Sequence, residues 1–236
     1  MRDCYLVEYD LLEYRKSLEL QKEIRAIKEG NRDFDDFLLV LQHNPVFTIG
    51  KRGTREDILV PEEGLIKEGI DVVEVKRGGE VTYHGPGQLV GYILLNLTRA
   101  KTSVDQFIWK MEEILIMLLK KYEIEGWRKE GYPGVWTDYQ KRKWKIAAIG
   151  ARVSKMITSH GLALNVNTDM DHFRMIVPCG ITEYEPISMK QVLNKSLVMK
   201  DVYENFENTF EEVFDMKLEK ISINKFEEMI KENAKS

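Results

Sequence analysis

Arg77-Gly-Gly-Glu-Val-Thr-Tyr-His-Gly-Pro-Gly-Gln88 is the segment that constrains the fold most strongly. Its first glycine pair predicts a hairpin-like return, and the apolar residues that follow predict a long strand over 88–97. The segment does not match a dinucleotide-binding fingerprint, because Gly85-Pro86-Gly87 precedes a strand instead of a helix. Its residues suit two structures: a plain hairpin followed by a turn, or a backbone that comes close to a ligand, since glycine allows positive φ.

Helices and strands alternate irregularly on both sides of this segment. The strongest helix is predicted over 103–122, where Ser103 and Gln106 have capping-box spacing and apolar residues recur at helical intervals. A weaker apolar repeat predicts a peripheral helix over the last ~15 residues. Because there is no steady β-α-β alternation, linker or repeat, the sequence predicts an α+β fold in one domain over 1–236. Further helices are predicted up to Gly30 and over 62–68 and 202–213, and further strands over 4–9, 37–41, 46–49, 72–76, 135–138, 145–153 and 161–166.

Composition excludes several classes of protein. The 236 residues, 43% of them hydrophobic, suffice for a large core. No apolar run approaches the ~20 residues of a bilayer span, and the N-terminus lacks a signal-peptide pattern, so we expect a cytoplasmic protein that does not bind membranes. The net charge of −4 argues against a nucleic-acid partner. Four scattered histidines and no paired cysteine motif predict no metal site.

The two cysteines have different surroundings in the sequence. Two cysteines cannot form a disulfide framework, so each is a structural residue or a reactive thiol. Cys4 lies in a predicted strand, and we expect it to be structural. Cys179 lies between Pro178 and Gly180, which predicts an irregular bend where a thiol is either an inert structural residue or exposed and reactive.

Lys145 and the histidines complete the set of candidate polar residues. Lys145 opens the apolar run 146–149, where it either extends along the edge of the core or serves as a base or as the cationic partner of a thiolate. His43 and His172 are expected to be structural, hydrogen-bonded residues. His84 and His160 each precede a glycine, so both are candidates for lining a pocket, and the residues alone assign them no role.

Five segments together resemble the octanoyltransferase family of lipoate biosynthesis, the lipoyl(octanoyl) transferases. They are 43–50, 77–88 with Tyr92, 145–150, 160–166 and 178–181, and they extend over nearly the whole chain. The resemblance implies the fold of the biotin protein ligase and lipoate–protein ligase catalytic domains, built around a mixed sheet. It implies that Cys179 is the nucleophile that carries the acyl group as a thioester. It also implies that Lys145 lowers the pKa of this thiol and transfers protons. The implied substrate contacts are Arg77, Gly78, Gly79, Glu80, Val81, Thr82, Tyr83, His84, Ala148, Ile149, Gly150, Gly161, Leu162 and Ala163.

The resemblance also implies a reaction and its partners. An acyltransferase of this family moves an octanoyl group from octanoyl-acyl carrier protein to a lysine of a lipoyl domain of 2-oxoacid dehydrogenases, or of the glycine-cleavage H protein, as a step of protein lipoylation. No cofactor is expected, because conversion of a thioester to an amide is downhill. Two alternatives stay open: an ATP-dependent lipoate or biotin ligase on the same fold, and a non-catalytic module that binds lipoyl domains or acyl carriers.

Acyl carrier proteins are acidic, and the net charge of this chain is also negative. Binding of the carrier therefore requires a local basic patch on this chain. Lys51, Arg52, Arg55 and the run 141–143 are the candidates for this patch.

Overall fold

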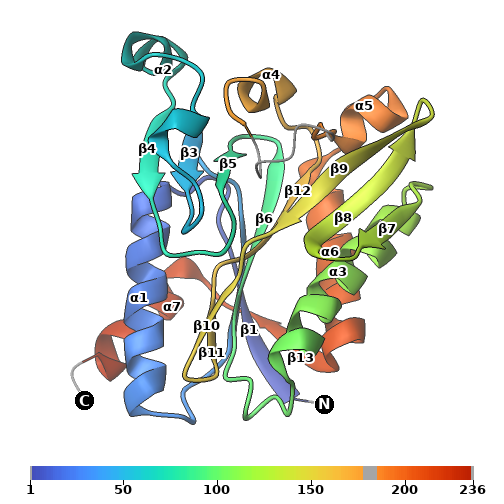
Figure 1. Cartoon of the computed structure of the whole chain (residues 1–236). Coiled ribbons are helices and arrows are strands. Elements are labelled where there is room, and N and C mark those ends of the chain that lie inside the picture. Colours follow the sequence, from blue (N-terminus) through green and yellow to red (C-terminus); the bar gives the residue numbers. More distant parts are fainter. Residues whose placement is uncertain (1, 178–184, 235–236) are drawn as a thin grey trace.

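The computed structural model describes residues 2–177 and 185–234, and its centre is a mixed eight-stranded sheet with helices on both faces (Figure 1). The strand order is β13-β1-β2-β6-β12-β9-β8-β7, and β1 is parallel to both of its neighbours while the other pairs are antiparallel. This arrangement confirms the predicted α+β class. The strands of this sheet are β1 (Arg2–Glu8), β2 (Phe37–Leu41), β6 (Gln88–Leu94), β7 (Gly126–Lys129), β8 (Tyr132–Tyr139), β9 (Arg142–Ile149), β12 (Gly161–Asn165) and β13 (Met216–Lys220).

Two smaller sheets stand beside the large one. β3 (Val46–Ile49) lies between β4 (Asp71–Glu74) and β5 (Val81–His84), and β10 (Arg152–Ser154) pairs with β11 (Ile157–Ser159). β5 carries the middle of the glycine-rich segment and pairs antiparallel with β3. The predicted hairpin-like return is wrong in its pairing, because β3 lies between β4 and β5 and the two strands that Gly78-Gly79 joins are not neighbours. Only the β4-β3-β5 sheet therefore carries the glycine-rich segment, while the β10–β11 hairpin lies apart from it, lower in the view (Figure 1).

Helices cover the two faces of the large sheet as their apolar periodicity requires. On one face, α3 and α6 bury aromatic residues such as Phe107 and Phe206 in a cluster that includes Cys4, which is 1% exposed, as its strand setting predicted. On the other face, α1 and α7 bury Ile24 and Phe226. The helices are α1 (Tyr14–Gly30), α2 (Glu62–Glu68), α3 (Val104–Lys120), α4 (Met170–Phe173), α5 (Met189–Leu193), α6 (Met199–Phe214) and α7 (Ile223–Asn233), with a 3-10 turn η1 (Arg55–Asp57).

The capping box predicted at the start of α3 is confirmed. The Ser103 hydroxyl accepts a hydrogen bond from the backbone N–H of Gln106 (3.2 Å), and the Gln106 side chain accepts one from the N–H of Ser103 (3.0 Å). Both bonds satisfy donors that a helix start would otherwise leave open. Within the described residues, no helix has the length and apolar character needed to cross a bilayer.

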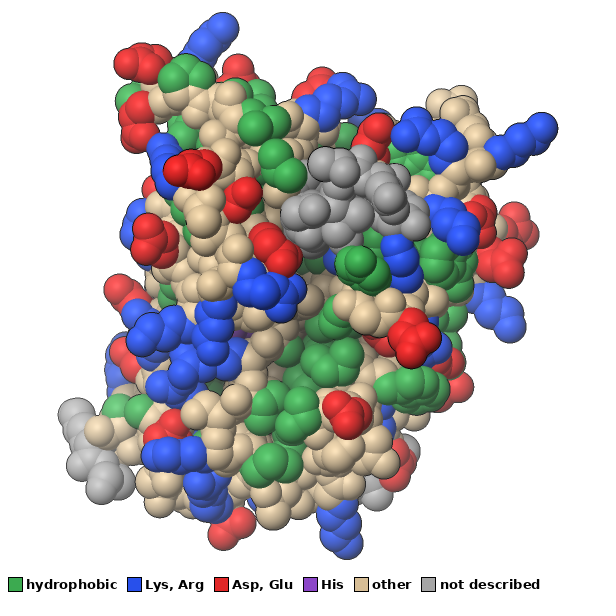
Figure 2. All heavy atoms as spheres, viewed as in Figure 1, with side chains coloured by type: hydrophobic (Ala, Val, Ile, Leu, Met, Phe, Trp, Pro, Cys, Tyr) green, Lys and Arg blue, Asp and Glu red, His purple; other side chains and the backbone are tan. Residues whose placement is uncertain are grey.

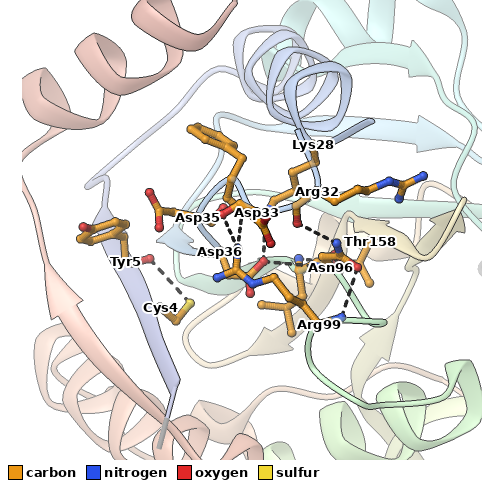
Figure 3. A network of polar contacts seen from close by, with 12 residues as sticks. Cys4, Tyr5, Lys28, Arg32, Asp33, Asp35, Asp36, Asn96, Arg99 and Thr158 are labelled. Atoms are coloured by element: carbon orange, nitrogen blue, oxygen red, sulfur yellow. Dashed lines mark hydrogen bonds and ion pairs between the residues drawn. The ribbon is translucent and has the colours of Figure 1, made fainter. Parts of the chain in front are cut away.

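A buried polar network joins the far end of α1 to three strands (Figure 3). Lys28 and Asp36 have no exposed side-chain surface, and the Lys28 ammonium donates to Asp36 Oδ1 at 2.7 Å. The same oxygen accepts from the backbone N–H of Asn96 (3.0 Å), while the Thr158 hydroxyl accepts from the N–H of Leu95 (2.7 Å). Because β11 ends at Ser159, this network fixes the chain immediately before His160.

Candidate active site

A pocket of about 540 Å³, its open mouth included, lies where α1, β5, β6, β9 and β12 meet. All of the contact residues implied by the resemblance line it, with the exception of Tyr83, and so does Lys145. Val81, Val90, Ile149 and Leu162 give the pocket apolar walls. The structure therefore brings together segments that are far apart in the sequence around one cavity that suits a chain of methylene groups.

Tyr83 points away from this pocket. Its hydroxyl lies 2.8 Å from Nδ1 of His172, and its ring contacts those of Phe47 and Phe173 edge-on, with centroids 5.8 and 5.4 Å away. Tyr83 is 1% exposed. Tyr83 thus packs β5 against α4, and His172 has the structural, hydrogen-bonded environment that the sequence predicted.

A β-bulge in β9 determines which side of the sheet Lys145 faces. Val135 pairs with Ala147, whereas the next residue, Trp136, pairs with Lys145, so β9 contains one extra residue at this point. Ile146 and Ala147 are both buried in the core against α3 and α6. The flanking residues Lys145 and Ala148 both line the pocket, which strict alternation along a regular strand would forbid. Bulges often redirect a side chain next to an active site, and this one does so for Lys145.

Gly134 on β8 leaves room for the Lys145 side chain. A Cβ on Gly134 would lie 2.8 Å from Cε of Lys145, and the residue has a φ of +137°, where side chains are strained. Two residues along β8 from this glycine is the buried Trp136, and the Lys145 ammonium lies 5.4 Å from the centroid of its ring. The amine therefore borders the pocket against an aromatic wall with an attractive cation–π geometry.

The other end of the pocket is a cluster of buried histidine and tyrosine rings. Tyr14 stacks on His84 (centroids 5.6 Å apart) and meets His43 edge-on (4.9 Å). His43 Nδ1 lies 2.6 Å from the carbonyl oxygen of Leu12, and its Nε2 lies 2.7 Å from the hydroxyl of Tyr92. His43 is thus the hydrogen-bonded structural residue that the sequence predicted, and Tyr14, His84 and Tyr92 line the pocket.

Arg77 brings a positive charge to this end. Its guanidinium donates to the hydroxyl and the carbonyl oxygen of Thr48 (2.8 and 2.7 Å) and to the carbonyl oxygen of Gly78 (2.8 Å). A Cβ on Gly50 would lie 2.7 Å from this guanidinium, and one on Gly150 would lie 3.2 Å from Cδ of Arg77. Glycine at these positions is what allows a buried arginine, 6% exposed, to fit beside the pocket.

Burial keeps these rings uncharged at neutral pH. It lowers the pKa of His43 to about 4, and burial together with the charges of Arg77 and Arg152 lowers the pKa of His160 to about 4. Burial, helped by the nearby His43, also lowers the pKa of His84 well below the usual value, while burial raises the pKa of Tyr14 to about 12. This end of the pocket therefore presents neutral dipoles beside the Arg77 charge.

Sequence reasoning named neither Tyr14 nor Val90 for the lining, and it gave Tyr92 only as part of a matching segment. Tyr14 begins α1, and no local pattern connects it to the glycine-rich segment. His160 was left without a role and lines the pocket, as does His84. Among residues 2–177 and 185–234, no three histidine, cysteine or acidic side chains come close enough together to hold a metal ion.

Cys179 lies outside the described residues, but the chain is described on both sides of it. Before it, the N–H of Val177 donates to the carbonyl oxygen of Asp57 (2.8 Å). After it, the N–H of Lys145 donates to the carbonyl oxygen of Glu185 (3.1 Å), and the N–H of Ile187 donates to that of Lys145 (3.0 Å). The chain that follows the cysteine segment therefore pairs with the backbone of Lys145.

Part of the expected basic patch is neutralised by acidic neighbours. Arg52 forms an ion pair with Glu80 at 2.7 Å, and Arg55 forms one with Glu62 at 2.6 Å. Arg142, in the run 141–143, lies 3.3 Å from a carboxylate oxygen of Glu185. These pairs reduce the positive potential that the sequence alone suggested for these segments.

The family model of the lipoyl protein ligase A/B catalytic domain matches residues 13–211. The chain belongs to this family. An octanoyltransferase of Caldicellulosiruptor saccharolyticus is 43% identical over 230 residues, which cover 97% of this chain and 94% of that protein. An octanoyltransferase of Desulforamulus reducens is 38% identical over 93% of this chain and 94% of its own length.

Solved structures of the ligases share the fold of this lipoyl protein ligase A/B family member. A bi-partite lipoate protein ligase system of Thermoplasma acidophilum superposes with a TM-score of 0.74 at 17% identity, over 100% of this chain and 93% of the other. Lipoate-protein ligase A bound with ATP superposes with a TM-score of 0.74 at 16% identity, over 100% of this chain and 95% of the other. Biotin protein ligase of Aquifex aeolicus superposes with a TM-score of 0.52 at 16% identity, over 89% of this chain and 70% of the other. At these identities the likeness concerns the fold, and it confirms the expected relation to both kinds of ligase.

Proposed function

We propose that the protein transfers an octanoyl group from octanoyl-acyl carrier protein to a lysine of a lipoyl domain or H protein, through a thioester on Cys179. Octanoyl transfer is the activity named for relatives that are 38% and 43% identical over more than nine-tenths of this chain. We extend the catalytic unit to the whole chain, 1–236. The cytoplasm is the proposed location, because an enzyme that depends on a reduced thiol suits a reducing compartment.

The activity named for these relatives carries the proposal, and the apolar lining of the pocket agrees with an eight-carbon substrate. Lys145 and His160 both line the pocket, at opposite ends of the stretch where Ala147–Ile149 of β9 pair with 162–164 of β12. From Lys145 to Gly150 the strand advances by ~13 Å, because the extra residue of the bulge adds no length. An extended octanoyl chain is ~9 Å long from its carbonyl carbon to its last methyl group. This wall is therefore longer than an extended octanoyl chain whose thioester carbonyl lies near Lys145.

The chemistry proceeds in two acyl transfers. The Cys179 thiolate attacks the carbonyl carbon of the donor thioester, the bond to the carrier sulfur breaks, and the carrier thiol leaves with a proton supplied through Lys145. The acceptor amine then attacks the acyl-enzyme, loses a proton to Lys145 and becomes an amide, while the Cys179 thiolate is released. A free thiol is only slightly ionised at neutral pH, since its pKa is ~8.5, so a neighbouring cation favours the reactive form.

The position of Lys145 supports this role. Its side chain borders the pocket, and its backbone pairs with Glu185 and Ile187, six and eight residues after Cys179. The bulge and the space over Gly134 would serve no purpose for a lysine that only extended along the edge of the core. Two chemical requirements of the reaction, a cation and a proton carrier, are met by this one amine.

An ATP-dependent ligase is the second candidate, and a solved neighbour bound with ATP favours it on fold alone. A ligase would activate free octanoate as an adenylate and would not need Cys179. A non-catalytic binding module would form no covalent adduct at all. The three functions therefore differ in what they do with a donor thioester when no nucleotide is present.

Intact-mass analysis separates these functions. Incubation with octanoyl-acyl carrier protein without ATP is expected to increase the mass by one octanoyl group, which neutral hydroxylamine removes. Cys179→Ala is expected to abolish the adduct. Cys4→Ala is the matched control and retains it, because Cys4 is 1% exposed in the core. An adduct on Cys4, or transfer that requires ATP, would contradict the proposal.

A further inference from the structure

A second hollow lies directly behind the polar end of the acyl pocket. It encloses about 860 Å³, its open mouth included, between α1, β4 and the β10–β11 hairpin. His160 lines both cavities, and Lys76 lines the hollow while the next residue, Arg77, lines the acyl pocket. The two cavities thus share a wall built from the same two short stretches of chain.

The hollow is strongly positive in a chain whose net charge is −4. Its lining contains four cations, Lys22, Arg25, Lys76 and Arg152, and one carboxylate, Glu74. Lys and Arg side chains gather over the upper part of α1 and the loop after β4 in Figure 2. Arg25 is paired with Glu29 at 3.4 Å. Close cations without compensating acids repel one another, so such a group is costly unless an anion binds there.

Three of these cations have no acidic partner within the described part of the chain. The ion pairs and side-chain hydrogen bonds of residues 2–177 and 185–234 include none from Lys22, Lys76 or the Arg152 guanidinium. By contrast, Arg15 and Arg52 on the same side of the molecule are paired with Asp71 and Glu80. The absence of pairing is therefore a property of the hollow and not of this surface in general.

Two buried polar atoms in the lining also lack partners among the described residues. Gln21 and His160 are 3% and 7% exposed, and neither Nε2 of Gln21 nor Nδ1 of His160 has a hydrogen-bond partner there. The two residues hold each other in place, because the side-chain oxygen of Gln21 accepts a hydrogen bond from the backbone N–H of His160 at 2.6 Å. A buried polar group without a partner costs free energy, and a bound ligand would reduce this cost by supplying the missing hydrogen bond.

We propose that this hollow binds a phosphate group. A phosphate carries up to two negative charges and several acceptor oxygens, which matches two lysine ammonium groups, the planar fork of Arg152 and the Gln21 amide. The phosphate belongs to a free phosphate compound, because the proposed thioester lies near Lys145, at the opposite end of the acyl pocket from the wall that His160 shares with the hollow. This exclusion of the arm that carries the acyl group rests on the proposed function, whereas phosphate binding itself does not.

Titration of the full-length protein with inorganic phosphate tests the site directly by calorimetry. Wild type is expected to bind phosphate, and Lys76→Gln/Arg152→Gln is expected to weaken binding by roughly tenfold or more, since hydrogen bonds to charged groups are lost. Lys121→Gln/Lys195→Gln is the matched control, because both lysines are exposed and the net charge changes equally. Lys22→Gln/Lys76→Gln, at two exposed positions, keeps the test decisive if the loss of the half-buried Arg152 disturbs folding.

The source of the phosphate is decided with two small donors, octanoyl-phosphopantetheine and octanoyl-pantetheine. If the donor arm supplies it, KM is lower for the phosphorylated donor in wild type, and the difference vanishes in the hollow variants. If a free phosphate compound supplies it, as proposed, the two donors have the same KM while phosphate still binds. No binding of phosphate by wild type, or equal loss in the hollow and control variants, overturns the proposal. Wild type that forms no adduct from octanoyl-acyl carrier protein overturns the proposed function instead, and the titration still decides the site.

Discussion

Replacing His43 by glutamine tests whether the histidine end of the pocket is held neutral by the fold. Glutamine can keep one donor and one acceptor near Leu12 and Tyr92, the partners of His43, but it does not titrate. In the folded protein, burial lowers the pKa of His43 to about 4. In the unfolded chain the same ring has a pKa of ~6.5.

The sign of the effect follows from which state binds the proton. Below about pH 6.5 the unfolded chain takes up a proton on His43, whereas the folded protein does so only below about pH 4. The contribution of the neutral ring to the free energy of unfolding is therefore fully present above the pKa of the unfolded chain. It is lost as the pH falls from about 6.5 to about 4. At pH 5 the loss amounts to about 2 kcal/mol for a histidine with a folded pKa of about 4.

A carboxylate opposes this trend and makes a comparison with the variant necessary. Burial and the nearby Glu8 raise the pKa of Glu207 to about 7, so this group stabilises the fold increasingly as the pH falls below that value. Its contribution is the same in wild type and in His43→Gln, so it cancels in the difference between them. The cost of imperfect hydrogen bonds from glutamine is also the same at both pH values and cancels.

Urea unfolding at pH 7.5 and pH 5.0 measures the difference, with the free energy of unfolding extrapolated to water. Wild type is expected to lose about 2 kcal/mol more than His43→Gln on acidification. His160→Gln should behave similarly, because burial with Arg77 and Arg152 lowers the pKa of His160 to about 4 as well. Equal loss of stability in wild type and both variants would show that these rings are not held neutral.

Three further substitutions test other parts of the structure. Lys145→Arg is expected to keep the pH dependence of Cys179 alkylation near that of wild type, because arginine holds the positive charge, whereas Lys145→Ala raises the pKa of the thiol. Both variants are expected to transfer the acyl group slowly, because neither side chain releases a proton near neutral pH. Full transfer by the alanine variant would remove Lys145 from both roles. Lys28→Met leaves the buried Asp36 carboxylate without its cation and is expected to cost ~3–5 kcal/mol in urea unfolding; a loss under ~1 kcal/mol would refute this. Gly161→Ala puts a Cβ 2.0 Å from the carbonyl oxygen of Gly91 and is expected to destabilise the protein by more than ~2 kcal/mol, whereas Gly30→Ala, with open space around it, stabilises it slightly; equal effects in thermal unfolding would contradict the steric argument.

Elements with a complete local pattern were predictable from the sequence. The helix predicted over 103–122 is Val104–Lys120, because its caps and apolar repeat are both local signals. The strand Phe37–Leu41 matches its predicted bounds, since a fully apolar run suits a strand buried on both faces. The strand β13 was missed, because Met216–Lys220 is largely charged and exposed, and its partner β1 lies at the other end of the chain.

Long-range contacts explain the remaining differences. The strand predicted over 145–153 is two strands, since the N–H of Gly150 donates to the carbonyl oxygen of Gly161 and the chain then turns into β10. The strand predicted over 88–97 ends at Leu94, because Asn96 instead bonds to the side chain of Asp36. In the site, the glycine-rich segment was recognisable by its composition. Tyr14 was not, because only the packing of α1 brings it to the pocket.

The bulge in β9 means that the lysine at this site is specified by counting as well as by identity. In a regular strand, the three-residue step from Ala148 back to Lys145 would turn the amine to the opposite face, toward α3 and α6. Deletion of Ile146 would remove the extra residue and the bulge together, so Lys145 would directly precede Ala147 and its amine would again face the pocket. A sequence that resembles this one but is one residue shorter between Lys145 and Ala148 therefore presents the same amine from a regular strand. A lysine transplanted onto another protein of this fold needs the bulge when it stands three residues before the alanine that faces the pocket, and needs a regular strand when it stands two residues before it.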